Sequence, residues 1–493
     1  MAPRPVFLDR ADAGRALARA LGAVASLRDV VVLGLARGGV PVARQVADAL
    51  GAPLDVIVVR KLGVPGVREV AVGAIAEGSN RVVGDSAGWY IGIPSHVVAR
   101  IARRERAELE RRACLYHAGR PIPDVRGHTV VLVDDGLATG ATLRAAAFVL
   151  RRRRPARLVV TVPVACRESA IELSDEVHHL IAAATPEPFG TVSDWYEDFS
   201  PVSDADVLRL LGRPPEVSLG RSDARHRDSQ DERTVTIPGE GGSIAGDLGL
   251  PDDLADGGAT RGFTEPRGLV VLAHGGGSSR HSYRNRYLAG RLRLEGWATL
   301  RLDLLLERER AHDDERGTLR FDVALIARRL LAAIDWAKCE HVPGANRVVL
   351  FGASTGAAAA LVAAAERPPL IAGVVTRGGR VDLAGDALSR VRAPVLMVVG
   401  GADADTLRWN REAMRVLRAD ARLEVIAGAG HTFEEPGTVG ALGEHVARWL
   451  DRLSRTAGER MWRHLFPLPA RFSELPGATM LERLTNVRRS SFP

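Results

Sequence analysis

The chain has 493 residues, too many for a single hydrophobic core, and its hydrophobic fraction of 46% is typical of globular proteins. No run approaches ~18 uninterrupted apolar residues and the first residues carry no apolar stretch, so neither a membrane span nor a secretion signal is expected, and cytoplasm is the predicted location. The net charge of +7 is carried mainly by arginine, and its one dense run, 151–154, stands at a predicted helix end where cations complement the dipole, so nucleic acid is not an expected partner.

In the first half, strand-like runs alternate with helical segments, a pattern typical of a mainly parallel sheet. The predicted strands cover residues 30–35, 54–59, 129–133, 158–162 and 179–184. Apolar residues at helical spacing predict helices after the first and third of these strands. We therefore expect an α/β domain over residues 1–212.

The most specific motif of this half is Val-Val-Leu-Val-Asp-Asp-Gly-Leu-Ala-Thr-Gly-Ala-Thr at residues 130–142. An apolar strand runs into Asp134 and Asp135 and then into a loop of small residues that begins a helix. Backbone N–H groups of such a loop form an anion pocket, to which threonine hydroxyls add donors. The loop residues with this expected role are Ala138, Thr139, Gly140, Ala141 and Thr142. Paired carboxylates beside a phosphate suit ribose hydroxyls, directly or through Mg²⁺, so Asp134 and Asp135 are also candidate metal ligands.

This motif resembles the signature of the type I phosphoribosyltransferases: an apolar strand, two acidic residues and a Thr-Gly-x-Thr loop. Residues 36–39, Ala-Arg-Gly-Gly, look like the family's pyrophosphate loop, which often holds a non-proline cis peptide, with Arg37 and Gly38 as ligand contacts. Lys61 and the stretch 63–78 resemble the mobile loop that closes over the reaction. The resemblance implies a Mg²⁺-dependent exchange of pyrophosphate for a nitrogen base on phosphoribosyl pyrophosphate.

The identity of the base stays open. The 6-oxopurine enzymes of this family have an aspartate just before the loop threonine, whereas this chain has Ala138, which weakens a hypoxanthine or guanine salvage role. Phe189, Trp195 and Tyr196 are candidates to stack on an aromatic base. The same three residues could equally form a structural corner.

Residues 213–232 are polar, rich in turn formers and without periodicity, which predicts a linker. Regular patterns resume with predicted strands at 234–237, 269–273, 298–302, 348–351, 395–399 and 423–426. We therefore expect a second parallel-sheet α/β domain over residues 233–453. The tail, 454–493, has no strong pattern and is a candidate contact in a possible homo-oligomer.

The sequence Gly-Ala-Ser-Thr-Gly at 352–356 follows a predicted strand and precedes an alanine-rich helix, as in a G-x-S-x-G nucleophile elbow. Ser354 is the candidate nucleophile. Later strand ends supply Asp403 and His431, in the order serine, acid, histidine, so that Asp403 would orient His431 and His431 would take the proton from Ser354. Asp405 is the competing acid.

A glycine-rich turn, His-Gly-Gly-Gly at 274–277, follows the strand 269–273. The amides of Gly275 and Gly276, together with that of Thr355, are candidate oxyanion-hole donors. We interpret His274 as a structural member of this turn.

The segment from about 234 to 453 resembles the α/β-hydrolase fold, and its compactness is similar to the dienelactone hydrolase family. Dienelactone hydrolases use a cysteine nucleophile, whereas this chain has Ser354, which weakens dienelactone as the substrate and favours a general esterase, lipase-like or peptidase-like acyl transfer on a small ester or related acyl substrate. The polar stretch 307–320 is expected to border the pocket. No cofactor is expected for this domain.

Two functions are compatible with these patterns. The first is a bifunctional enzyme with a phosphoribosyltransferase site and a separate serine hydrolase site. The second is a hydrolase whose N-terminal domain binds phosphoribosyl pyrophosphate or a nucleotide as a regulatory sensor without turnover. Either way the expected partners are small molecules: phosphoribosyl pyrophosphate, an unidentified base and an unidentified ester.

Overall fold

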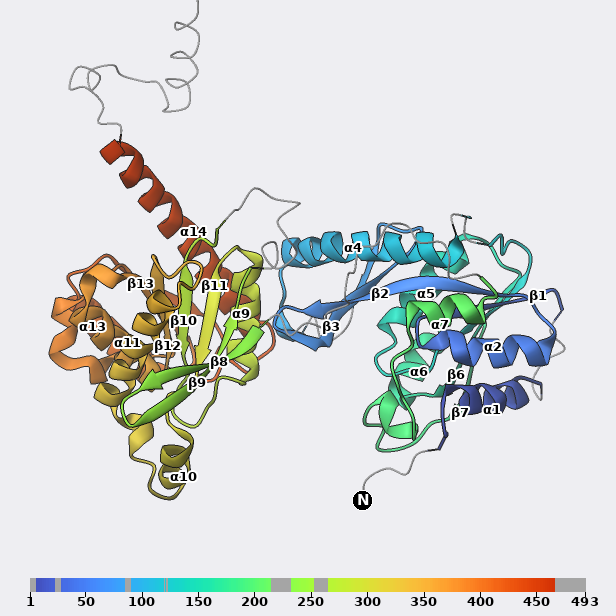
Figure 1. The fold of residues 1–493 in the computed structure, drawn as a ribbon, viewed down its shortest axis with the longest axis horizontal. Helices are drawn as coiled ribbons and strands as arrows, with labels where there is room; N and C mark the ends of the chain where they lie inside the picture. Colours follow the sequence, from blue (N-terminus) through green and yellow to red (C-terminus); the bar gives the residue numbers. More distant parts are fainter. Residues whose placement is uncertain are drawn as a thin grey trace, which may run out of the picture.

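The structure is a computed structural model that describes residues 6–22, 28–84, 90–118, 120, 123–213, 232–251 and 265–465. Within these ranges two separate sheets each carry helices on both faces, so the chain forms two α/β domains (Figure 1). This confirms the expected fold class of two mainly parallel-sheet domains. No helix in the described part of the chain is long and apolar enough to cross a membrane.

The N-terminal sheet has seven strands in the order β4-β3-β2-β1-β5-β6-β7. Five of them run parallel, and β3 and β4 extend one edge in antiparallel fashion. The strands are β1 (Val30–Ala36), β2 (Leu54–Val64), β3 (Val67–Ala76), β4 (Val82–Gly84), β5 (Thr129–Val133), β6 (Arg157–Val164) and β7 (His179–Ala184).

Helices cover both faces of this sheet, because successive residues of a strand point to opposite sides. In β5, Val131 and Val133 pack with α1 and α2, whereas Val130 and Leu132 pack with α5, so all five residues of the strand are buried. The helices are α1 (Arg10–Gly22), α2 (Gly39–Leu50), α4 (Ser95–His117), α5 (Ala141–Arg152), α6 (Arg167–Ser174) and α7 (Asp204–Leu210), with a 3₁₀ turn η1 (Val192–Trp195).

The C-terminal sheet has eight strands in the order β15-β14-β13-β12-β10-β11-β9-β8. The six from β15 to β11 run parallel, and β9 and β8 are antiparallel additions. The strands are β8 (Glu232–Gly239), β9 (Gly242–Gly249), β10 (Leu269–Ala273), β11 (Ala298–Leu302), β12 (Val348–Ala353), β13 (Ile371–Arg377), β14 (Val395–Gly400) and β15 (Ala421–Ile426).

One face of this sheet packs against α11 and α12, and the other packs against α9 and α14. The helices are α9 (Tyr283–Leu294), α10 (Glu307–Arg316), α11 (Val323–Cys339), α12 (Thr355–Glu366), α13 (Ala404–Val416) and α14 (Thr438–Leu465). Short 3₁₀ segments are η2 (Leu319–Phe321), η3 (Pro368–Leu370) and η4 (Val381–Arg390).

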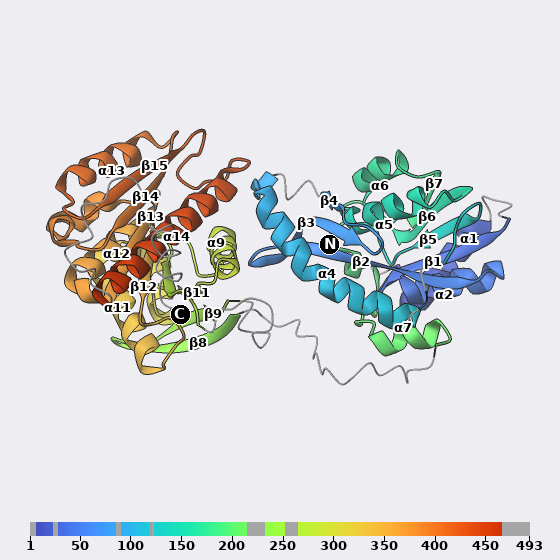
Figure 2. The same cartoon turned by 90° about the horizontal axis from the view of Figure 1, so that it is seen from above.

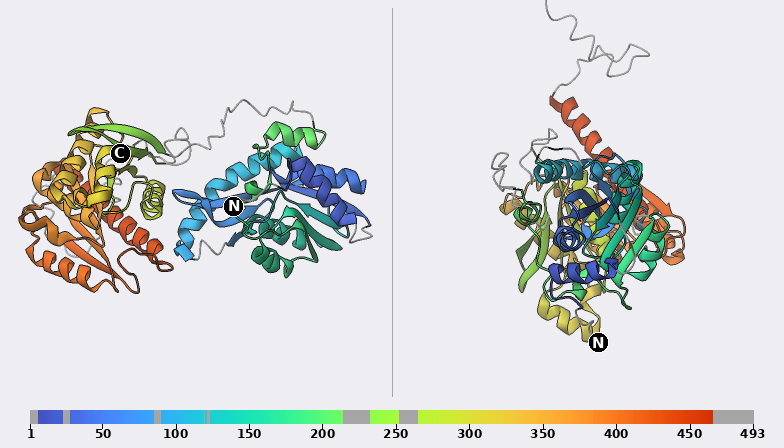
Figure 3. Two further views of the ribbon diagram at one scale, coloured as in Figure 1. Left: turned by 90° about the horizontal axis from the view of Figure 1, so that it is seen from below. Right: turned by 90° about the vertical axis from the view of Figure 1, so that its right-hand side faces the viewer.

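The two domains meet on the α9 and α14 face of the second sheet (Figures 1 and 2). The turn between β2 and β3 and the start of α4 reach across to α9 and to the start of α14, and the left view of Figure 3 shows the two domains meeting when seen from below. Arg100 of α4 donates a hydrogen bond of 2.7 Å to the carbonyl of Leu294 and lies 3.0 Å from the carboxylate of Glu295.

Glycines allow the backbones to touch at this interface. A Cβ atom on Gly290 of α9 would collide with the backbone of Gly66, and one on Gly440 of α14 would collide with the carbonyl of Gly92. Because these glycines face each other across the domain boundary, the two backbones approach more closely than any side chain would permit.

Two expectations about the strands of the first and second domains are wrong. The stretch 63–78 is not a loop: it holds the end of β2 and all of β3, whose apolar side chains pack against α4. Strands β3, β4, β9 and β13 were not expected, and β13 lies between β12 and β14, so the strands that precede Ser354 and Asp403 are not neighbours.

The expected boundary at residue 453 lies inside α14, which continues to Leu465. Residues 454–465 contain no proline, and the first proline after them is Pro467, so nothing in this sequence interrupts the helix. The rest of the predicted tail, 466–493, and residues 214–231 of the predicted linker lie outside the described residues.

Candidate active sites

The N-terminal candidate site lies where β1 and β5 end side by side. Asp134 and Asp135 directly follow β5, and the glycines of the 36–39 loop lie against them: a Cβ atom on Gly38 would collide with the Asp135 carboxylate. The Ala36–Arg37 peptide bond is cis, a feature expected from the resemblance of this loop to the pyrophosphate loop of type I phosphoribosyltransferases. The structure therefore brings the two predicted ligand loops into direct contact.

The loop that was expected to hold a phosphate is open to solvent at Ala138 and Thr139. Gly140 precedes α5 with a φ of 78°, a left-handed conformation that glycine adopts without strain. The loop therefore presents its amides at the N-terminus of α5, where the helix dipole favours an anion. Ala141 is buried and Thr142 is half-buried in the first turn of the helix.

The two carboxylates differ in their partners. Asp134 is buried and accepts a hydrogen bond of 2.9 Å from the amide of Asp135. Burial and the charge of Asp135 raise the pKa of Asp134 well above its ordinary value. Burial also raises the pKa of Asp135, although Arg10 opposes this through an ion pair of 2.9 Å.

Arg10 is a site residue that sequence reasoning missed. Its guanidinium also donates to the carbonyl of Ser200 and stacks over the ring of Phe199 at 3.8 Å. Arg10 and Asp135 are 125 positions apart and Arg10 belongs to no local motif, so no pattern in the sequence signals the pair.

The candidate base-stacking residues do not present open ring faces. Trp195 and Tyr196 are buried, and the Tyr196 hydroxyl donates a hydrogen bond of 2.6 Å to the carbonyl of Asp135. Trp195 donates to the carbonyl of Phe189, and the two rings pack 6.4 Å apart. The structure thus favours the structural-corner alternative for Trp195 and Tyr196, whereas Phe189 is only half-buried.

Arg37 and Lys61 are the two basic side chains that were predicted to contact phosphoribosyl pyrophosphate. Arg37 points toward Asp204 of α7, with 3.5 Å between the charged groups. Lys61 is exposed on β2, three residues beyond Val58, where the parallel pairing with β1 ends. Among the described residues, Arg37 forms its ion pair with Asp204 and none with Asp134 or Asp135.

In the second domain, Ser354 stands on a sharp turn between β12 and α12. Its φ of 48° and ψ of −118° fall in a backbone region that residues other than glycine rarely adopt. Such strain is typical of a nucleophile elbow. The turn is possible because its neighbours are small: a Cβ atom on Gly356 would lie 2.6 Å from the carbonyl oxygen of His274. The Ser354 side chain is half-buried.

His431 and Asp403 form the acid–base pair predicted from the sequence. His431 Nδ1 lies 2.7 Å from Asp403 Oδ2, so Nε2 remains for the serine. Burial would raise the pKa of Asp403, but hydrogen bonds from Thr406 and His431 outweigh it and lower that pKa. Asp405 is exposed and pairs with Arg408, so the structure selects Asp403 over the competing acid.

Ser354 and His431 lie on either side of Gly378, which follows β13. The Ser354 amide donates to the carbonyl of Arg377 at 3.1 Å, and a Cβ atom on Gly378 would lie 3.6 Å from His431 Nδ1. The unexpected strand β13 therefore ends beside both residues, with Arg377 next to the serine and Gly378 next to the histidine.

The glycine turn after β10 lies beside the serine. A Cβ atom on Gly275 would lie 3.0 Å from Cβ of Ser354, and Thr355 begins α12 directly after the serine, so both predicted donor residues lie beside it. His274 is held through its ring, with Nδ1 2.8 Å from the Gly275 carbonyl and Nε2 3.4 Å from the Leu304 amide, which supports its structural role.

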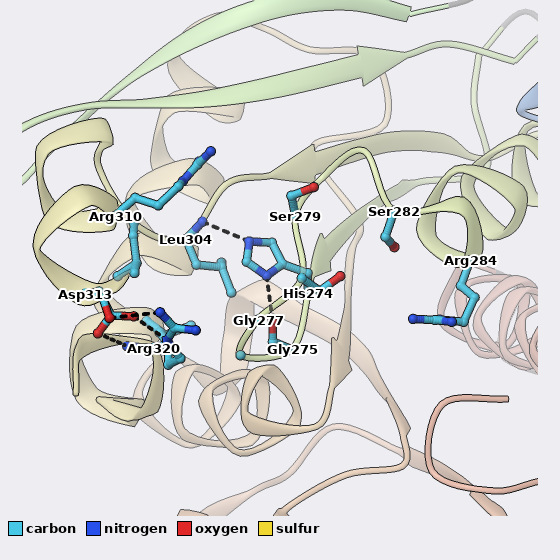
Figure 4. A pocket seen from close by; sticks show the side chains of 14 residues that line it. His274, Gly275, Gly277, Ser279, Ser282, Arg284, Leu304, Arg310, Asp313 and Arg320 are labelled. Carbon is cyan, nitrogen blue, oxygen red and sulfur yellow. Dashed lines mark hydrogen bonds and ion pairs between the residues drawn. The ribbon is translucent and has the colours of Figure 1, made fainter. Parts of the chain in front are cut away.

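A cavity of about 530 Å³ opens along this turn (Figure 4). Its walls include the polar segment predicted to border the pocket, since Arg310, Asp313 and Arg320 all line it. Arg320 donates to Asp313, and Arg284 of α9 lies on the far side. The cavity is lined by Gly275, whose Cβ position would lie 3.0 Å from Cβ of Ser354, so the candidate nucleophile stands beside this part of the cavity wall.

Fold and sites together define a two-domain protein of the phosphoribosyl transferase and α/β-hydrolase classes. The family model for the phosphoribosyl transferase domain matches residues 9–182, and that for the dienelactone hydrolase family matches residues 268–467. A Mycobacterium tuberculosis H37Rv protein named "Putative phosphoribosyl transferase" is 41% identical over 446 residues, which cover 90% of this chain and 97% of the relative. The chain therefore belongs to the same family as this relative and carries a phosphoribosyl transferase domain and a dienelactone hydrolase domain.

Two solved structures are similar to parts of the chain. Dienelactone hydrolase from Anabaena variabilis is 42% identical, with 45% of this chain and 97% of that chain covered and a TM-score of 0.41. TT1426 from Thermus thermophilus is 43% identical, with 42% and 98% covered and a TM-score of 0.36.

Proposed function

We propose that the chain is a bifunctional enzyme, with a Mg²⁺-dependent phosphoribosyltransferase site in the N-terminal domain and a Ser-His-Asp esterase site in the C-terminal domain. The contact between the 36–39 loop and the Asp134–Asp135 pair supports the first activity. The hydrogen bond between His431 and Asp403, beside the strained Ser354, supports the second. Both sites lie at the carboxyl ends of parallel strands, where α/β sheets bind ligands.

In the transferase, the bond from the anomeric carbon to pyrophosphate would break and a bond to a base nitrogen would form. Loop amides at 138–142 would bind the 5-phosphate, and the two carboxylates would accept hydrogen bonds from ribose hydroxyls. Arg10 would keep Asp135 ionised and oriented.

Magnesium fits this donor set, because a divalent cation would relieve the repulsion between two adjacent carboxylates, and Mg²⁺ is usually held by one or two carboxylates together with substrate phosphates. Asp134 and Asp135 would be its protein ligands, and the bound ion would neutralise charge on the departing pyrophosphate.

In the hydrolase, Ser354 Oγ would attack the ester carbonyl while His431 Nε2 takes its proton and then passes it to the leaving alcohol. Asp403 holds the opposite ring nitrogen and would stabilise the imidazolium. Amides of Thr355, Gly275 and Gly276 would bind the oxyanion. Water would then release the acyl group from Ser354.

A fluorophosphonate probe tests the hydrolase. Wild-type protein should be labelled and Ser354→Ala should not, while ester hydrolysis falls by about three orders of magnitude or more. Ser389→Ala changes a half-buried serine on η4, is the matched control and should behave as wild type. Labelling that survives Ser354→Ala would remove this serine as the nucleophile.

For the transferase, phosphoribosyl pyrophosphate with Mg²⁺ should raise the Tm, and Asp135→Asn should abolish that rise. Asp175→Asn, an exposed aspartate after α6, should keep it. Pyrophosphate release with one member of a panel of bases would establish turnover. An unchanged Tm for the wild type would contradict the proposed ligand.

One observation favours the sensor alternative for the N-terminal domain. The hairpin of β2 and β3, which corresponds to the expected closing loop, packs against α9 of the hydrolase domain through Gly66 and Gly290. A hairpin held there is placed to transmit ligand binding to the hydrolase. Ligand-dependent Tm without pyrophosphate release for any base would support this alternative.

A further inference from the structure

A second cavity, of about 540 Å³, lies between the two domains. The N-terminal domain contributes Val70 of β3 together with Tyr90 and Ile91, which precede α4. The hydrolase domain contributes Tyr283 and Arg284 of α9, the segment Phe433–Glu435 and Val439 of α14. Most of these side chains are aliphatic or aromatic, so the cavity suits an apolar group.

The wall of this interdomain cavity includes the segment that follows the candidate catalytic histidine in the chain. Phe433, on its wall, is two residues after His431, and its φ of 56° turns the chain sharply at that point. Arg284 lines both this cavity and the one along the oxyanion turn. The two cavities therefore share a wall at Arg284.

The wall supplied by the N-terminal domain is fixed to the hydrolase loop that follows His431. The amide of Gly437 donates to the carbonyl of Tyr90 at 2.7 Å, and the Tyr90 hydroxyl donates to the carbonyl of Glu434 at 3.0 Å. Gly92 meets Gly437 by backbone contact. These bonds hold Tyr90 and Ile91 in a defined position over the cavity.

Unpartnered polar atoms belong to Tyr283 and Arg284, which line the cavity, and to Arg377, which lies 6.0 Å from the ring of Phe433 on its wall. Within the described residues, the Tyr283 hydroxyl, Arg284 Nε and two nitrogens of Arg377 are buried without a hydrogen bond. Arg377 is 8% exposed, and its carbonyl anchors the Ser354 amide. Buried donors without partners are costly, so an oxygen acceptor on a bound ligand would stabilise them.

We propose that the interdomain cavity receives the apolar part of the ester substrate, and that Val70, Tyr90 and Ile91 of the N-terminal domain set the size of the group it accepts. The inference rests on the proposed hydrolase and deepens it: the preferred substrates are esters with an aliphatic or aromatic group longer than acetyl. The N-terminal domain is then a specificity element of the hydrolase as well as a ligand-binding domain.

The test compares 4-nitrophenyl acetate with 4-nitrophenyl octanoate on the full-length protein. Ile91→Trp fills the cavity and should lower kcat/KM for the octanoate by about tenfold or more, while acetate changes by less than about twofold. Ile171→Trp is the matched control, since Ile171 is an exposed residue on α6, and should leave both substrates unchanged.

Tyr90→Ala provides the opposite change on a residue that is 53% exposed and tolerant of truncation. It enlarges the cavity and should raise the octanoate-to-acetate ratio of kcat/KM by about threefold or more. Tyr90→Phe removes only the hydrogen bond to Glu434 and should keep a ratio nearer to wild type.

The outcomes separate this inference from the function on which it rests. If wild-type protein neither reacts with the fluorophosphonate nor hydrolyses either ester, the hydrolase proposal fails and this inference with it. If the probe and acetate react normally but the cavity variants leave the chain-length ratio unchanged, the cavity is a packing void only.

Discussion

His117 illustrates at the residue scale how the end of α4 is held against strands β2 and β3. It lies at the end of α4, with Nε2 3.0 Å from Glu77, which follows β3, and Nδ1 3.7 Å from Asp55 of β2. Burial would lower the pKa of His117, but the two carboxylates outweigh it and raise that pKa from 6.5 to about 9. The charged imidazole thereby ties α4 to the hairpin that reaches the hydrolase domain.

The raised pKa of His117 predicts that the stability of the folded protein depends on pH. Because the pKa of His117 is raised on folding, its contribution is complete below pH 6.5 and disappears as the pH rises through about 9. His117→Gln should therefore reduce the free energy of unfolding at pH 6 by up to about 3 kcal/mol, and by much less at pH 10. Urea denaturation of both proteins at the two pH values measures the difference.

The control for this measurement is His179→Gln on β7, where the histidine is exposed. Its effect should be small and equal at both pH values. An effect of His117→Gln that is the same at pH 6 and pH 10 would mean that the imidazole is neutral in the folded protein.

Residues with a local motif could be predicted from the sequence, and residues that act across the fold could not. The elbow around Ser354 and the acidic pair at 134–135 are continuous patterns at strand ends, so their position followed from alternation and turn chemistry. Arg10 meets Asp135 across 125 positions, and Arg377 lies at the end of a strand that was not expected. Such contacts depend on tertiary topology, which local spacing does not encode.

At the element scale, the domain contact depends on glycines in two helices. Gly290 lies in α9 and Gly440 in α14, where glycine is unfavourable by roughly 0.5–1 kcal/mol relative to alanine. Alanine at either position would nevertheless overlap the backbone of Gly66 or Gly92. Close approach of the two domains therefore outweighs helix propensity at these sites.

Gly290→Ala and Gly440→Ala should each weaken the interface. Overpacking of this kind costs about 1–3 kcal/mol, so the first thermal transition should fall by about 2–8 °C. Gly22→Ala is the control, because Gly22 ends α1 and a Cβ atom there meets nothing within 4 Å. Calorimetry of the full chain measures the shift, and an unchanged transition in both interface variants would mean that the domains do not touch in this way in solution.

Some strands could be predicted from the sequence and others could not, depending on how continuous their apolar runs are. β5, β10 and β11 are five-residue strands with every residue buried, and their bounds were predicted without error because continuous apolar runs stand between turn residues. β13 follows two prolines and contains Gly373, which obscured its apolar pattern. β3 also contains glycine, and resemblance to a mobile loop masked its alternation.

At the scale of the whole molecule, one hydrophobic cluster crosses the domain boundary. It joins Val97 and Ile101 of α4 and Ile91 to Tyr287 and Leu292 of α9, and continues into α14. Interfaces between domains of one chain are usually more polar than this, and a shared apolar cluster favours a fixed orientation. The interdomain cavity keeps a defined shape only if that orientation is kept.

The interface should therefore hold the domains together without the connecting chain. A Gly-Ser segment carrying a protease site, inserted within residues 214–231, is flexible by composition and allows specific cleavage. After cleavage the two pieces should co-elute in size-exclusion chromatography at micromolar concentration, because the contacts of α4 and the β2–β3 hairpin with α9 and α14 remain. The cleaved Gly290→Trp protein should elute as two smaller species, since indole cannot fit against Gly66.

Separation of the cleaved wild-type pieces would show that the covalent link, not the shared apolar cluster, keeps the domains adjacent. The N-terminal wall of the interdomain cavity would then be transient.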